Sequence, residues 1–226
     1  AKFLGENPEY SAVHGLGTLA VVQANGTGNR VVATGYYRQQ VSEDETASQR
    51  LRHHFSNYAG TGFSVHRIES MRVMFQRVHE VLDRGFAGEA LPNSLTVVLG
   101  KVKELGCFYL VRQIHQARHL LPSQFDWITS ENWFPSYVIF LERMSEEVAR
   151  LDGIGLEEAQ AVVKAAFSGA LATALKNQWE QAHRDQTTQT PFKLRQAAAR
   201  VPGLKLFWNM TKAYLPGERN AMTLRA

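Results

Sequence analysis

The chain has 226 residues, of which 44% are hydrophobic and 20% charged, and its formal net charge at pH 7 is +4. These values are typical of a globular protein that buries a core, and they exclude a collagen-like or wholly disordered chain. Cys107 is the only cysteine. A disulfide within the chain is therefore excluded, a cysteine-based zinc site is disfavoured, and a cytoplasmic setting is expected. No apolar run approaches the roughly 18 residues of a membrane span, so none is expected.

The first part of the chain predicts a small β element. Residues 19–23 and 30–38 are rich in β-branched and aromatic side chains, and Asn25-Gly26 lies between them. An Asn-Gly pair between two such runs is typical of a β-hairpin. A further β-rich run at 95–99 would add a third strand.

Most of the remaining chain has helical signals. Residues 42–45, Ser-Glu-Asp-Glu, have the form of a capping box with Ser42 as N-cap, and Ser64 is a second N-cap candidate. Apolar residues at helical spacing predict the rest of each helix, and Cys107 falls among them and is expected to be buried. Helices are expected over 42–58, 65–84, 101–121, 137–151 and 156–183. The fold class predicted is mainly α, a helical bundle with a small N-terminal β-hairpin or three-stranded sheet.

A cluster of basic residues lies in the first of these helices. It consists of Arg50, Arg52, His53 and His54. We interpret it as a solvated helix face, with phosphate contact as the alternative.

The last two helices meet at a corner that contains two glycines. Gly153 can end the first helix in a left-handed conformation, and Ile154 can fill the gap between the helices. Gly155 leaves backbone N–H groups uncovered at the start of the next helix, where a phosphate can bind. Residues 148–163 resemble the helix-hairpin-helix motif of DNA-binding proteins. The resemblance implies that Gly153 and Gly155 grip a nucleic-acid backbone without reading its sequence.

The corner departs from that motif at one point. The family often has a basic or hydroxyl residue after the second glycine, whereas this chain has Glu157 and Glu158. Carboxylates in a first helical turn favour the helix through its dipole, but they repel phosphate. An ordinary corner with well-capped helices is therefore the alternative.

A polar face of the expected helix 101–121 is a second candidate for nucleic-acid contact. It consists of Arg112, His115, Gln116 and His119. Arginine and glutamine offer donors that match base edges, while a plain exposed face is the alternative. The two histidines have the i,i+4 spacing of metal ligands, but a third ligand and the glutamate of an H-E-x-x-H motif are missing. No metal is therefore expected.

The segment 125–135 is dense in aromatic residues. Such residues can stack on bases, but they more often anchor a loop on a core. We expect packing.

A polar linker at 185–190 precedes a basic tail. Residues 191–226 hold seven basic residues and one acidic residue, a charge of +6, so residues 1–190 carry −2 of the whole chain's +4. An acidic partner explains this asymmetry, and nucleic acid also suits the tail's aromatic residues. The candidate contacts in the tail are Lys193, Arg195, Arg200, Lys205, Trp208 and Lys212.

These features divide the chain into an N-terminal α+β region (1–125), a helical region with the corner (126–190) and the basic tail (191–226). They predict a non-catalytic nucleic-acid-binding protein that binds DNA in preference to RNA, as a regulator or as a subunit of a larger nucleoprotein complex. The alternative is a helical protein–protein interaction or scaffold protein, with protein partners or a second copy of itself. No catalytic or cofactor-binding motif is recognisable, so neither an activity nor a cofactor is expected.

Overall fold

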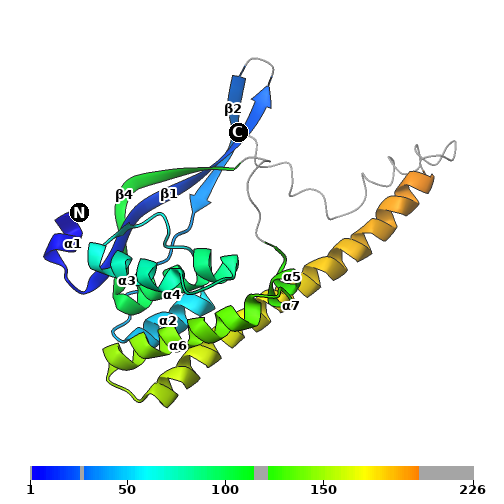
Figure 1. Cartoon of the computed structure of the whole chain (residues 1–226). Coiled ribbons are helices and arrows are strands. Elements are labelled where there is room, and N and C mark those ends of the chain that lie inside the picture. The colour runs from blue at the N-terminus through cyan, green and yellow to red at the C-terminus, as the bar shows by residue number, and fades with distance from the viewer. Residues whose placement is uncertain (1, 26–27, 115–121, 199–226) are drawn as a thin grey trace. The chain divides into compact units, whose positions relative to one another are not determined.

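The computed structural model describes residues 2–25, 28–114 and 122–198, and the side chains of residues 2–23, 28–114 and 122–184. The chain forms two compact units, residues 1–175 and 176–226. The first unit holds the described strands and most of the helices (Figure 1).

The first unit is built on a mixed β-sheet of four described strands. They are β1 (Tyr10–Asn25), β2 (Gly28–Tyr37), β3 (Val65–His66) and β4 (Lys101–Ile114). Strand β4 runs parallel to β1 along one edge, while β2 and β3 pair antiparallel with different parts of the opposite edge. The long strand β1 is therefore the centre of the sheet. The expected hairpin is present as β1 and β2, with Asn25 opposite Gly28.

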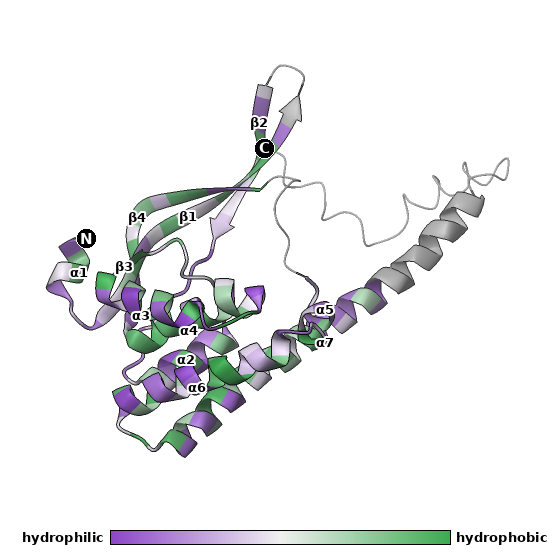
Figure 2. Cartoon of the chain, viewed as in Figure 1, coloured by the Kyte–Doolittle hydropathy of each residue, from purple (hydrophilic) through white to green (hydrophobic). Residues whose placement is uncertain are grey.

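The described helical elements are α1 (Lys2–Glu6), α2 (Ala47–Ser56), α3 (Ile68–Val78), the π-helical turn η1 (Phe86–Ala90), α4 (Leu91–Leu99), α5 (Gln124–Ile128), α6 (Trp133–Asp152) and α7 (Leu156–Ala198). Of these, α1 and α4 make the main contacts with the sheet. Helix α4 contacts α2, α3, α6 and the sheet. Figure 2 shows α4 as one of the most hydrophobic segments, and it is the centre of the core. Its Leu91, Leu95 and Val98 are fully buried.

Of the aromatic residues expected to pack in the segment 125–135, the two tryptophans do so, whereas Phe125 and Phe134 are exposed. Trp127 and Trp133 lie against the core, where both rings are close to the buried ring of Phe86, with centroids 5.0 and 5.8 Å away. The segment 125–135 therefore joins α5 and α6 to the core.

The fold class expected from the sequence is wrong. The run 101–114, predicted as helix, is strand β4, and the run 95–99, predicted as strand, lies in α4. The fold is mixed α/β with a sheet larger than a small N-terminal hairpin. The physical reason is tertiary: β4 forms its ladder with β1, about 90 residues earlier in the chain, and aromatic and β-branched residues such as Phe108, Tyr109 and Val111 suit that ladder.

Several element boundaries also differ. The capping box of α2 uses Thr46 and Gln49, four residues beyond the one expected, while Ser42 forms a β-bridge to Val102. The second expected helix is shorter, Ile68–Val78. Helix α7 continues through 185–190, where a polar linker was expected.

Cys107 is a further correction. It was expected to be buried on a helix, and it is exposed on β4 instead. The change of secondary structure moves it, since strand residues alternate between two faces of a sheet that is open here.

Candidate nucleic-acid interface

The part of the sheet that extends beyond the helices has a distinct composition. Residues 15–38 and 105–114 contain three arginines and no aspartate or glutamate. All of β2 is exposed except Tyr37, which is partly exposed, and so are most residues of β4 after 105. A positively charged surface therefore surrounds this end of the sheet.

The strand register assigns residues to the two faces of the sheet, because directly paired residues share a face. On one face, Gly17 pairs with Tyr37, Leu19 pairs with Arg112, and Gln23 pairs with Arg30. The ring of Phe63 lies 6.1 Å from that of Tyr37. We call Arg30, Tyr37, Phe63 and Arg112 the arginine face.

Arg112 is held at the centre of this face by aromatic rings. Its guanidinium carbon lies 5.0 Å from the ring centroid of Tyr37 and 5.3 Å from that of Phe63. Its Nη1 donates a hydrogen bond of 2.7 Å to the Tyr37 hydroxyl. Stacking of this kind fixes the guanidinium plane and leaves its other N–H groups available to a ligand.

A glycine makes this arrangement possible. A Cβ on Gly17 would stand 2.8 Å from the carbonyl oxygen of Tyr37 and 3.0 Å from its Cδ1. Tyr37 can therefore approach β1 this closely only because position 17 lacks a side chain.

The opposite face of the same strands is apolar. Leu16 pairs with Phe108, Thr18 with Val111 and Tyr36, and Val22 with Val31. We call Leu16, Val31, Tyr36, Phe108 and Val111 the apolar face; their exposed fractions run from 41% at Leu16 to 69% at Phe108. Exposed apolar patches of this kind mark interaction surfaces.

The corner between α6 and α7 has the backbone geometry expected of it. Gly153 is left-handed, with φ 66° and ψ 30°, and its N–H donates to the carbonyl of Ala149. Ala159 is fully buried and Ile154 packs on the core. Gly155 is exposed, and its φ is not positive.

The charged groups around the corner serve structural contacts. The Asp152 carboxylate accepts hydrogen bonds from the backbone N–H of Ala47 (2.7 Å) and of Ser48 (2.8 Å), at the start of α2. Burial raises the pKa of Asp152, but these hydrogen bonds and one from the Ser48 hydroxyl outweigh it and leave the pKa below its usual value. The corner is thereby fixed to α2. Glu157 and Glu158 are exposed beside it, so its outer surface is acidic.

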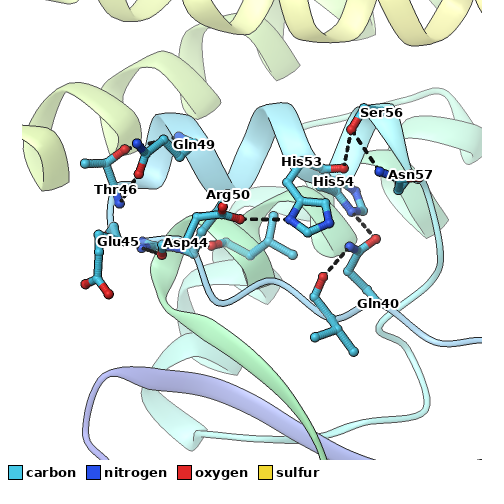
Figure 3. Close-up of polar contacts among 12 residues, drawn as sticks. Gln40, Asp44, Glu45, Thr46, Gln49, Arg50, His53, His54, Ser56 and Asn57 are labelled. Carbon is cyan, nitrogen blue, oxygen red and sulfur yellow. Dashed lines mark hydrogen bonds and ion pairs between the residues drawn. The ribbon is translucent and has the colours of Figure 1, made fainter.

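The basic cluster on α2 does not form one solvated face. Arg50 is buried and donates to the carbonyls of Val97 and Val98 at the end of α4. His54 is also buried, with Nδ1 2.9 Å from Oε1 of Gln40 (Figure 3). Only Arg52 is exposed, while the ring of the partly exposed His53 faces Asp44 at 2.8 Å. Buried polar contacts, which the sequence did not reveal, divide the cluster.

The residues expected to contact nucleic acid lie in separate parts of the described structure or outside it. Arg112 lies on strand β4, so the helix face it was to share is not formed, and His115, Gln116 and His119 lie outside the described residues. Gly153 and Gly155 lie at the α6–α7 corner, on the other side of the helices from the free end of the sheet (Figure 1). Lys193 and Arg195 belong to α7, without described side chains. The remaining tail candidates, Arg200, Lys205, Trp208 and Lys212, lie outside the described residues.

Three residues of the arginine face were not predicted as site residues. Arg30 and Tyr37 were assigned to a β run, and Phe63 was not considered. The one available signal was the absence of acidic residues from 15–38, which does not reveal the partner strand at 105–114.

Comparison with known proteins adds no identification. No protein-family model, curated protein or solved structure matches the chain. Within the described ranges, none of the helices combines the length and apolar character needed to cross a membrane. The same ranges contain no group of three or more His, Cys, Asp or Glu side chains that could hold a metal ion.

Proposed function

We propose that the protein is a non-catalytic nucleic-acid-binding protein and that the arginine face is its main described contact surface. The observation that carries the proposal is the position of Arg112, stacked against Tyr37 and Phe63 in a part of the sheet without acidic residues. Arginine in this setting binds phosphate, and the exposed ring of Phe63 and the partly exposed ring of Tyr37 offer stacking surfaces for bases. We propose DNA as the preferred nucleic acid, since the corner at 148–163 resembles a DNA-binding motif. The protein would act as a regulator or as a nucleoprotein subunit.

The proposal is tested by replacing arginines on and off this face. Fluorescence anisotropy with labelled single-stranded and duplex DNA and RNA, at two salt concentrations, measures binding. Replacing both Arg30 and Arg112 with alanine should weaken binding and reduce the salt slope by about one unit for each phosphate interaction that the substitutions remove. Arg72→Ala is the matched control, since Arg72 is an exposed arginine on α3.

An unchanged affinity and salt slope in a folded Arg30/Arg112 double variant would reject the arginine face as the contact surface. Equal losses of affinity in the double variant and in Arg72→Ala would show only a general dependence on net charge. No binding of any of the four nucleic acids by the native protein would reject the function itself.

The corner and the tail are proposed as further contacts and are tested separately. A side chain at Gly155 meets open space, so Gly155→Val should keep the fold and weaken binding if backbone N–H groups there hold a phosphate. Removing residues 199–226 keeps the described helix α7 intact and deletes Arg200, Lys205, Trp208 and Lys212. If binding and salt slope survive this truncation unchanged, these four tail residues are not contacts.

The apolar face supports a second candidate function, assembly with a protein partner or with another copy of the chain. Its five side chains share one face of the sheet, and the Tyr36 hydroxyl donates a 2.7 Å hydrogen bond to the carboxylate of Glu104 beside them. Phe108→Ser should then lower the mass of any oligomer measured by light scattering, or release a co-purifying partner. Phe75→Ser is the control, because Phe75 is equally exposed (67%) on α3. A native protein that is monomeric and captures no partner would reject this alternative.

A further inference from the structure

A cavity of about 210 Å³ lies in the first unit, away from both faces of the extended sheet. Four elements meet around it: the end of α2, the turn η1, α5 and the middle of α7. Its lining includes Phe55, Tyr58, Glu89, Trp127, Phe167 and Ala170. The cavity is mostly apolar, and its volume suits a small organic molecule rather than a nucleotide or a peptide.

Aromatic rings form the walls, and they are fixed in place. Phe55 and Phe167 are buried and meet edge to face, with centroids 5.6 Å apart. The Trp127 indole Nε1 donates a 2.8 Å hydrogen bond to Asp83. A Cβ on Gly85 would stand only 2.5 Å from that Nε1, so the glycine allows the ring to approach. These walls are therefore preorganised.

Space remains at the cavity because two of the residues that line it from α7, next to Phe167 and Leu171, are small. Ala170 and Ala174 line it from α7, one helical turn apart. A larger side chain at either position would project towards the aromatic rings and fill the space.

Among the described residues, one carboxylate lines this aromatic cavity. It belongs to Glu89, which raises the pKa of Tyr58 by its charge and by a hydrogen bond, in addition to the larger effect of burial. The Tyr58 hydroxyl also accepts a 2.9 Å hydrogen bond from Asn93, whose Oδ1 accepts from both the backbone and the hydroxyl of Thr61. Asn93 and Thr61 are buried. The hydrogen bond from Asn93 thus fixes the Tyr58 hydroxyl, and the exposed Glu89 adds its carboxylate to the lining of the cavity.

We propose that this cavity binds a small organic cation, a molecule with an apolar body and one amine or quaternary ammonium group. Aromatic faces attract such a cation through their quadrupoles, and the apolar body gains by leaving water. Glu89 supplies the opposite charge, and among the described residues no lysine or arginine lines the cavity to compete for it. An anionic ligand would meet the carboxylate, with no compensating positive group among the described lining residues.

Two probes of nearly the same shape test the charge directly. Benzylamine is a cation at pH 7 and benzyl alcohol is neutral, and both are small enough for the cavity. Calorimetry or ligand-observed NMR on the full chain should show tighter binding of benzylamine. Glu89→Gln should weaken benzylamine binding on the order of tenfold and leave benzyl alcohol unchanged. Glu157→Gln, which removes an exposed carboxylate at the start of α7, should change neither.

A second variant tests the location. Ala170→Phe should abolish binding of both probes by filling the space, with circular dichroism confirming that the fold is kept. If that variant does not fold, benzylamine-induced NMR shifts confined to Phe55, Tyr58 and Trp127 locate the site in the native protein. Equal affinity for the two probes, binding that survives Ala170→Phe, shifts elsewhere, or no binding of benzylamine would each overturn the proposal. None of these outcomes depends on whether the protein binds nucleic acid.

Discussion

Gly153 and Gly169 are both exposed glycines of the α6–α7 pair, but their backbones differ. Gly153 has φ 66°, a conformation that costs a residue with a Cβ about 1 kcal/mol, whereas Gly169 lies in the interior of α7. Neither would meet another atom through an added Cβ. Gly153→Ala should therefore lower the free energy of unfolding by about 1 kcal/mol, and Gly169→Ala should raise it by up to about 1 kcal/mol.

Urea denaturation of the two variants beside the native protein measures both changes. The two changes in the free energy of unfolding should have opposite signs although the substitution is the same, because the backbone conformations of the two glycines differ. If both variants are destabilised by a similar amount, the effect of the substitutions on stability comes from packing rather than from backbone conformation.

At the scale of elements, Asp152 joins the corner to the N-terminus of α2. It accepts three hydrogen bonds there, including one of 2.5 Å from the Ser48 hydroxyl. Asp152→Asn should cost about 1 kcal/mol at pH 7, because it removes the charge and because the amide nitrogen that replaces one carboxylate oxygen cannot accept a hydrogen bond. Because its pKa is lowered in the folded state, this contribution is complete above the ordinary pKa of the carboxyl and is lost as pH falls through the lowered value.

Thermal unfolding of native protein and variant between pH 7 and pH 2 checks both statements. The difference in unfolding temperature between the native protein and Asp152→Asn should become smaller towards pH 2. Glu142→Gln, an exposed carboxylate on α6, should have little effect at any pH. A constant difference down to pH 2 would argue against the charge of Asp152 as its cause.

The stability of the whole first unit should depend on pH through His54. Burial, helped by the charge of His53, lowers the pKa of His54 to about 3, against an ordinary value of 6.5. Between these values the unfolded chain binds a proton that the folded protein does not. The free energy of unfolding should therefore fall by about 1.4 kcal/mol per pH unit as pH is lowered from 6.5.

His54→Gln should remove this slope even though it also lowers stability at neutral pH. The slope is measured by urea denaturation at pH 7, 6 and 5, where the carboxylates remain largely ionised. Parallel slopes in the native protein and the variant would assign the pH dependence to other groups. His54 Nε2 has no hydrogen-bond partner among the described residues, in agreement with a neutral ring.

Local features of the chain were predictable because their causes lie within a few residues. Asn25-Gly26 marked the hairpin, and Gly153 marked a left-handed helix end. The aromatic residues Trp127 and Trp133 were expected to pack, and they do. In each case turn chemistry or local composition favours one outcome regardless of what lies nearby in the fold.

The arginine face and the cavity could not be predicted in this way. Arg112 and Tyr37 are 75 residues apart in the chain, and the helix expected at 101–121, of which 101–114 is a strand, would have separated them. The cavity joins Phe55, Glu89 and Ala170 from three elements. Such sites depend on strand register and on helix packing, which a single sequence leaves open.

The sequence by itself determined the hairpin, the glycine corner, the apolar segments and the charge asymmetry, because each follows from residue type over a short span. Only the tertiary structure decided that 101–114 is a strand and that Arg50 and His54 are buried. The spacing of apolar residues at 101–114 is compatible with a helix and with a strand. Long-range pairing with β1 selects the strand, because the pairing satisfies the backbone hydrogen bonds of both segments. The same pairing places Arg112 beside Tyr37 and so creates the surface proposed to bind nucleic acid.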